Sequence, residues 1–172
     1  IGMILASLNL LASSYLPSTV LAALLITLEI ILTGGLHGYG LMDTADGIFS
    51  ARTRERMLEI MKDSRVGANG VMTFCLFVLV KWSLLMELPA AERTLALLVM
   101  PVLSRFAMVM GITLFPYARP DGIGKAFAQY AGRKALYIAA LLTVCIIIFC
   151  GKAAWISMAA IILFTILFGH YV

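Results

Sequence analysis

Six apolar runs alternate with short polar segments along the chain, at about 1–15, 18–36, 67–86, 94–115, 135–150 and 154–172. A helix needs about 20 mostly apolar residues to cross the hydrocarbon core of a bilayer, and most of these runs approach that length. The pattern predicts an all-α protein, a polytopic membrane helical bundle with about six transmembrane helices. One domain over residues 1–172 is enough for a chain of this length.

The composition supports a membrane protein. Apolar residues make up 62% of the chain and charged residues only 13%, with a mean hydropathy of +1.02, whereas a soluble domain carries about 25% charged residues. The net charge of +4 is expected to reflect unequal loops, so no nucleic-acid partner is predicted. Cys75, Cys145 and Cys150 lie inside apolar runs without metal-ligand spacing, which predicts packed or lipid-facing thiols.

Lysines and arginines are distributed unequally between the two sides of the predicted bundle. The segments after the second and fourth runs hold nine of them: Arg52, Arg54, Arg56, Lys62, Arg65, Arg119, Lys125, Arg133 and Lys134. The segments on the opposite side hold only Arg93 and Lys152. Because cytoplasmic loops carry the excess of positive charge, the first group is predicted to face the cytoplasm.

An acidic segment at residues 37–66 follows the second run. It holds five of the nine carboxylates: Asp43, Asp46, Glu55, Glu59 and Asp63. The first two are three residues apart and the last three follow at intervals of four, so each set would share one face of a helix. Two facing acidic stripes need a counter-charge. We expect Mg²⁺, because it prefers oxygen ligands and shares its coordination with phosphates.

The basic residues of the acidic segment fit a phosphate ligand. Arg52, Arg56 and Arg65 could bind phosphate oxygens in bidentate fashion. His37 could orient a carboxylate or contact phosphate, or it could be a simple helix-end histidine. The alternative for the whole segment is a solvated, charge-balanced loop helix whose acids and arginines are ordinary helical neighbours.

Three ionisable residues lie within the apolar runs. Glu29 could be functional, as intramembrane carboxylates commonly are, or a neutral hydrogen-bonded group. Arg105 is expected to face the polar interior, toward Glu29 or the acidic stripes. Lys81 is expected to snorkel toward the outer interface. Since P-loop, G-x-S-x-G, H-E-x-x-H and C-x-x-C motifs are absent from the sequence, the acids favour metal-assisted transfer of a phosphate-linked group.

A resemblance to the cobalamin synthase family, the adenosylcobinamide-GDP ribazoletransferases, is carried by GGLHGYGLMDTADGIFSARTRERMLEIMKDSRVGANGV. The family motif H-x-D-G-x-x-D-x-x-D-G is matched at His37, Gly40, Asp43, Asp46 and Gly47. A second block, E-I-M-[KR]-D-x-R-x-G, is matched at Glu59, Lys62, Asp63, Arg65 and Gly67. Residues 101–127 resemble a later family block at Ser104, Arg105 and Arg119.

The resemblance implies an enzyme that joins adenosylcobinamide-GDP to α-ribazole or its 5′-phosphate, giving adenosylcobalamin or its 5′-phosphate and GMP. It implies a multi-pass protein of a bacterial or archaeal cytoplasmic (inner) membrane, with its site facing the cytoplasm. The implied Mg²⁺ ligands are Asp43, Asp46, Glu59 and Asp63. The implied catalytic residues are Asp43, Asp46, Asp63, Arg65 and His37. The implied substrate-binding residues are Arg52, Arg56, Lys62, Ser104, Arg105 and Arg119.

The chain departs from the family pattern at Tyr39, where the family motif has its first aspartate and the resemblance implies a metal ligand. The chain starts inside an apolar run and stops before a family segment resembling G-G-x-T-G-D-x-x-G-A, so we expect truncation at both ends. The lipid bilayer is an expected partner, and a homo-oligomer is left open.

The sequence leaves two alternative functions. A CDP-alcohol phosphotransferase would carry a D-G-x-x-A-R pattern that does not occur in the chain. A membrane cation transporter could use Glu29, Asp43 and Asp46 as a relay, but transport predicts acids spread over several spans near the bilayer midplane. Both are therefore weaker predictions than the ribazoletransferase.

Overall fold

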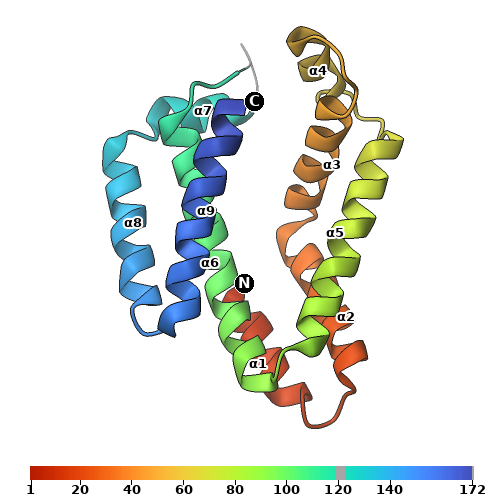
Figure 1. Cartoon of the computed structure of the whole chain (residues 1–172), viewed down its shortest axis with the longest axis vertical. Coiled ribbons are helices and arrows are strands. Elements are labelled where there is room, and N and C mark those ends of the chain that lie inside the picture. The colour runs from red at the N-terminus through yellow and green to blue at the C-terminus, as the bar shows by residue number, and fades with distance from the viewer. Residues whose placement is uncertain (119–122, 172) are drawn as a thin grey trace. The chain divides into compact units, whose positions relative to one another are not determined.

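A computed structural model describes residues 1–118 and 123–171, and all the secondary structure in these residues is helical (Figure 1). The helices are α1 (Gly2–Ala12), α2 (Ser18–Thr33), α3 (Leu36–Ile48), α4 (Arg54–Ile60), α5 (Ala68–Glu87), α6 (Ala90–Leu114), α7 (Ile123–Tyr130), α8 (Arg133–Ile147) and α9 (Gly151–Tyr171). A helix covers most of each of the six apolar runs, which confirms the all-α prediction.

Several of these helices can cross a membrane. Helices α5, α6 and α9 have 20, 25 and 21 residues and are sufficiently apolar. The pairs α2–α3 and α7–α8 bend by 90° and 93° at a short break, and each pair could form one broken span. The described part of the chain therefore has three to five candidate spans, compatible with the approximate prediction of six. α1, with 11 residues, is shorter than a span requires.

The chain divides into two compact units, one of Ile1 and Met3–Thr94 and the other of Gly2 and Leu95–Val172. In the first unit, α5 packs against α2 and α3, and α3 also packs against α4. In the second unit, α8 packs against α9. A buried cluster in the second unit consists of Val99, Leu103, Ile147 and Ala154. The single-domain organisation stays a prediction.

Two consecutive glycines separate α2 from α3. Gly34 and Gly35 have φ values of 60° and 71°, in the left-handed region that side chains with a Cβ rarely adopt. The Gly35 amide donates a hydrogen bond to the Ile30 carbonyl, which closes the end of α2. The break redirects the chain by 90°, so Asp43 and Asp46 lie on a separate helix, α3.

Small residues bring α3 and α5 close together. A Cβ on Gly38 of α3 would lie 2.9 Å from a ring carbon of Phe74, and one on Gly70 of α5 would lie 2.8 Å from the Met42 carbonyl oxygen. The two helix backbones can therefore approach only because these positions lack side chains. This interface fixes the position of the acidic end of α3 against the start of α5.

A buried polar cluster holds α1 in the first unit. The Arg93 guanidinium donates to the Asn9 side-chain oxygen at 2.6 Å and to the Leu85 carbonyl at 3.2 Å. Asn9 in turn donates to the Thr94 hydroxyl at 2.8 Å. Arg93, one of the two charges predicted for the outer side, is only 3% exposed and connects the start of α6 with α1 and with the end of α5.

Candidate functional site

Asp46 connects the acidic end of α3 to the first turn of α5. Its two carboxylate oxygens accept hydrogen bonds from the backbone amides of Gly67 and Gly70, at 2.7 and 2.8 Å. These amides belong to the start of α5, where backbone donors lack partners within the helix. A negative charge is also favoured there by the helix dipole. Asp46 therefore caps α5, a role that its spacing from Asp43 did not reveal.

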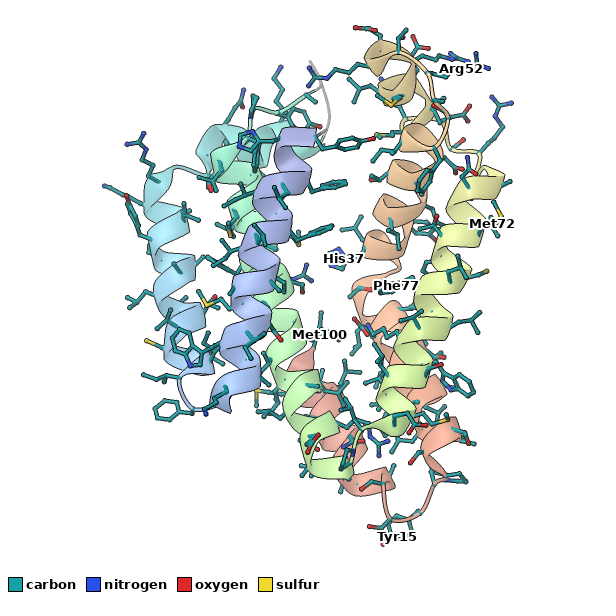
Figure 2. All side chains as sticks on the ribbon, viewed as in Figure 1. Tyr15, His37, Arg52, Met72, Phe77 and Met100 are labelled. Atoms are coloured by element: carbon teal, nitrogen blue, oxygen red, sulfur yellow. The ribbon has the colours of Figure 1, made fainter. Side chains whose placement is uncertain are left out.

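Asp43 and His37 lie on the same helix as Asp46 but at different distances from it. Asp43 precedes Asp46 by three residues, which places both carboxylates on one face. His37 lies six residues before Asp43, or about 9 Å along the helix axis at the usual rise per residue. In Figure 2, His37 lies well away from Arg52, which marks the end of this unit where α4 lies. The histidine and the acids are thus on one helix but not side by side.

Asp63 and Arg65 form a bidentate ion pair in the segment that precedes α5. The Arg65 side chain donates to both Asp63 oxygens, at 3.0 Å from Nε and 2.6 Å from Nη2, and its backbone amide donates at 3.0 Å. These bonds to Arg65 lower the pKa of Asp63 to about 2. The Asp63 carboxylate in turn raises the pKa of Arg65. Asp63 is therefore ionised at neutral pH and already has a cation beside it.

The predicted metal ligands do not converge in the described part of the chain. Glu59 pairs with Arg56 on α4, Asp63 pairs with Arg65, and Asp46 binds the start of α5. Within residues 1–118 and 123–171, no group of three histidine, cysteine, aspartate or glutamate residues could hold a metal ion. The predicted set of four ligands is brought to one unit without being assembled into one cluster.

The predicted substrate-binding residues are divided between the two halves of the chain. Arg52, Arg56 and Lys62 are exposed in the segment around α4, together with Arg65. Ser104 and Arg105 lie on α6 in the second unit. There the Ser104 hydroxyl donates to the Pro101 carbonyl at 3.2 Å, and an Arg105 nitrogen lies 3.0 Å from the Met108 sulfur. Arg119 lies outside the described residues.

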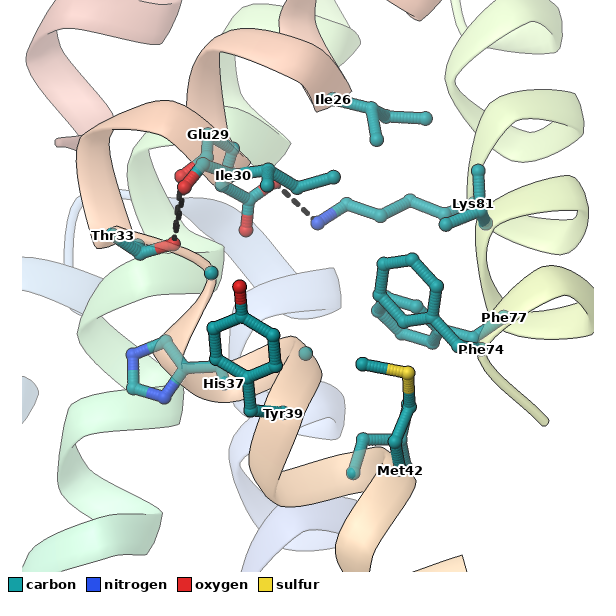
Figure 3. Close-up of a pocket in the computed structure, with 14 residues that line it drawn as sticks. Ile26, Glu29, Ile30, Thr33, His37, Tyr39, Met42, Phe74, Phe77 and Lys81 are labelled. Carbon is teal, nitrogen blue, oxygen red and sulfur yellow. Dashed lines mark hydrogen bonds and ion pairs between the residues drawn. The ribbon is translucent and has the colours of Figure 1, made fainter. Parts of the chain in front are cut away.

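A cavity of about 460 Å³ lies in the first unit and is lined by residues of α2, α3 and α5 (Figure 3). Glu29 of α2 and Lys81 of α5 form an ion pair in its wall, with side chains 24% and 14% exposed. The expectation that Lys81 snorkels to the outer interface is therefore wrong, because Glu29 supplies a nearer partner. The cavity was not predicted, although two isolated charges of opposite sign in neighbouring apolar runs could have indicated the pair.

Comparison with known proteins gives consistent matches. A family model described as Cobalamin-5-phosphate synthase matches residues 1–172. A protein of Desulfitobacterium hafniense named adenosylcobinamide-GDP ribazoletransferase is 50% identical over 131 residues, covering 74% of this chain and 51% of the relative. A protein of the same name from Desulforamulus reducens is 51% identical over 115 residues, covering 67% of this chain and 46% of the relative.

A third protein of that name, from Listeria monocytogenes serotype 4b, is 38% identical over 159 residues, covering 91% of this chain and 63% of the relative. The chain thus spans about half the length of the first two relatives. No solved structure matches the chain.

Proposed function

Because the chain belongs to the cobalamin-5-phosphate synthase family, we propose that it has the activity for which its relatives are named, adenosylcobinamide-GDP ribazoletransferase. A bond forms between the ribose 3′-oxygen of α-ribazole, or its 5′-phosphate, and the phosphorus that bears the cobinamide. The bond from that phosphorus to the GMP oxygen breaks, and the hydroxyl proton passes to a base on the protein. The products are adenosylcobalamin, or its 5′-phosphate, and GMP.

The observation that supports this proposal most directly is the pair of hydrogen bonds that the Gly67 and Gly70 amides donate to Asp46. It ties the acidic end of α3 to the segment that holds Asp63 and Arg65. Carboxylates and cationic side chains are thereby held at one end of the first unit. Such a combination suits transfer of a phosphate-linked group, in which positioning and charge neutralisation supply most of the catalysis.

The basic residues around α4 would bind the diphosphate of the corrinoid nucleotide. Arg52, Arg56 and Lys62 are exposed and available to a large charged ligand. Arg65 would exchange Asp63 for phosphate oxygens, because a guanidinium binds carboxylate and phosphate in the same bidentate geometry. Its charge would then stabilise the transferred phosphoryl group. Ser104, Arg105 and Arg119 remain proposed contacts from the second half of the chain.

The carboxylates of α3 suit Mg²⁺ in chemical type. Mg²⁺ commonly binds through one or two protein carboxylates together with waters and substrate phosphates, and Asp43 and Asp46 supply two on one helix face. These two residues would hold the ion, and Glu59 and Asp63 would join only after leaving their arginines. Bound Mg²⁺ would neutralise negative charge on the diphosphate. Tyr39→Asp would add a carboxylate one turn before Asp43.

A base is also needed for the ribose hydroxyl. Asp43 is the nearer candidate for a hydroxyl held at the acidic end of α3, because His37 lies about 9 Å further back along the helix. His37 lines the cavity and would orient the acceptor instead. The base must lie within hydrogen-bond reach of the ribose hydroxyl, and this requirement decides between Asp43 and His37.

The distribution of charge supports a location for the site. The excess of lysine and arginine in the segments after the second and fourth apolar runs supports a cytoplasmic active site in a multi-pass protein of the inner membrane. The apolar helices make the lipid bilayer a partner of the protein. A homo-oligomer stays a prediction.

Release of GMP tests this function. The purified protein in liposomes is given adenosylcobinamide-GDP with and without α-ribazole phosphate, and with and without Mg²⁺. We expect release only when both are present, and a lower Mg²⁺ requirement in Tyr39→Asp. Asp43→Asn should abolish release, while Glu55→Gln, an exposed acid outside the proposed ligand set, should not. Release that ignores Mg²⁺, or survives Asp43→Asn, would contradict the assignment of the acids.

A further inference from the structure

The cavity between α2, α3 and α5 has a wall suited to a flat apolar ring. Its volume of about 460 Å³ lies in the range of small-molecule sites, which are mostly apolar with a few polar groups. Phe74, Phe77 and Met42 contribute two aromatic rings and a thioether (Figure 3). Aromatic side chains stack on flat rings, and methionine adapts to their edges.

Polar groups gather on one side of this cavity. The Glu29–Lys81 ion pair lies in the wall, and the hydroxyl end of Tyr39 points toward that side (Figure 3). A largely covered ion pair among apolar helices is costly to maintain, and ionisable groups in such positions commonly serve a function. An ammonium has three donors, so Lys81 can bind Glu29 and still donate to one acceptor on a ligand.

The cavity also lies in line with the acids of α3. Tyr39 lines the cavity, and Asp43 follows four residues later on the same helix face. The two positions are separated by about 6 Å along the axis. A ring held in the cavity could therefore extend a substituent to Asp43 without bending around the helix.

We infer that this cavity binds the benzimidazole base of α-ribazole and directs its ribose 3′-hydroxyl along α3 toward Asp43. The inference rests on the proposed function and adds to it the position of the acceptor. Among the groups of the two substrates, this base is flat, mainly apolar and has one unsubstituted ring nitrogen, an acceptor for Lys81. Guanine has polar groups along several edges, and the corrin ring with its amide arms is much larger than the cavity.

A lipid acyl chain is a less suitable occupant. It would place hydrocarbon against the Glu29–Lys81 pair and offer no acceptor to the ammonium, which is unfavourable for a charged group removed from water. A flexible chain also gains less than a flat ring from the aromatic wall. The pair and the rings together favour a heteroaromatic ligand.

Filling the cavity tests the inference. Val78 lines the cavity from α5, and Val80 of the same helix is 58% exposed and does not line it, so Val80→Phe is a matched control for Val78→Phe. The measurement is equilibrium dialysis of α-ribazole against each protein in lipid nanodiscs, without corrinoid. We expect Val78→Phe to weaken binding about tenfold or more, the usual effect of altered pocket shape, and Val80→Phe to leave it unchanged. If Val78→Phe does not fold, Ile30→Phe fills the cavity from α2 and should weaken α-ribazole binding by the same factor.

The outcomes separate the cavity from the reaction. Failure of α-ribazole to bind the parent protein, or equal binding to a folded Val78→Phe or Ile30→Phe variant, would overturn the inference. Binding that is lost on filling the cavity supports it even if no GMP is released, in which case the proposed function alone fails. If GMP is released and Val78→Phe leaves the KM for α-ribazole unchanged, the proposed function stands and the inference about the cavity fails.

Discussion

The contact between Asp46 and the start of α5 can be tested by adding a single methyl group. A Cβ on Gly67 would overlap the Asp46 carboxylate, and all three of its nearest heavy atoms belong to that side chain. The Gly67 backbone, with φ −88° and ψ 169°, is compatible with alanine. Gly67→Ala should therefore destabilise the protein only by displacing Asp46.

The size of the effect follows from the two hydrogen bonds that Asp46 accepts. Each hydrogen bond to a charged group contributes about 1.5–3 kcal/mol, and partial exposure places these near the lower end. We expect Asp46→Ala and Gly67→Ala each to lower the free energy of unfolding by about 2–3 kcal/mol. Because both remove the same bonds, the double variant should cost little more than Asp46→Ala alone, a coupling of about 2 kcal/mol.

The assay is a double-mutant cycle by denaturant titration in mixed micelles, with hydrogen exchange of residues 67–70 as a local readout. Gly70→Ala is the matched control, because a Cβ there would also lie 2.8 Å from the Met42 carbonyl oxygen. A Cβ on Gly70 would lie 2.5 Å from an Asp46 oxygen as well, so only the part of its cost that comes from the Met42 carbonyl should persist when Asp46 is removed. Additive costs for Gly67→Ala and Asp46→Ala would refute the reasoning, since the methyl group would then be acting on something other than the carboxylate.

Two further predictions concern ion pairs. Lys81→Met should lower the free energy of unfolding by about 3 kcal/mol, because it leaves the Glu29 carboxylate without its partner. Adding Glu29→Gln to Lys81→Met should recover most of that loss. A double variant less stable than Lys81→Met in the same denaturant titration would contradict this. Arg65 holds the pKa of Asp63 at about 2 against an ordinary 3.8, so the order that this pair gives its segment is fully present above the ordinary value and lost as pH falls through about 2. Arg65→Gln should return the pKa of Asp63 toward 3.8, measured by NMR titration of the carboxyl carbon, and an unchanged midpoint would show that Arg65 is not the cause.

Hydropathy predicted the helices well, because length and apolar content decide whether a segment can be helical in a membrane. It did not predict the turn at Gly34–Gly35. The second apolar run continues to residue 36, whereas α2 ends at Thr33 and the chain bends by 90°. Two glycines with positive φ change the direction of the chain without changing its hydropathy, so the apolar pattern contains no sign of the bend.

The candidate site was predictable in its residue types and less so in its contacts. Spacing placed Asp43 and Asp46 on one helix face, as the structure has them. It could not show that Asp46 binds backbone amides of α5, because that contact joins residues more than 20 positions apart. His37 was placed with the acids because they are near in sequence, but a helix converts six residues into about 9 Å.

Quantifying both products in one reaction tests the proposed transferase most directly. The purified protein in liposomes is given adenosylcobinamide-GDP, α-ribazole phosphate and Mg²⁺, and GMP and the ribazole-containing corrinoid are measured together by mass spectrometry. A transferase that uses the ribose hydroxyl as its nucleophile predicts equal amounts of the two. GMP without the joined corrinoid would indicate hydrolysis by water, and the absence of both products would contradict the ribazoletransferase activity itself.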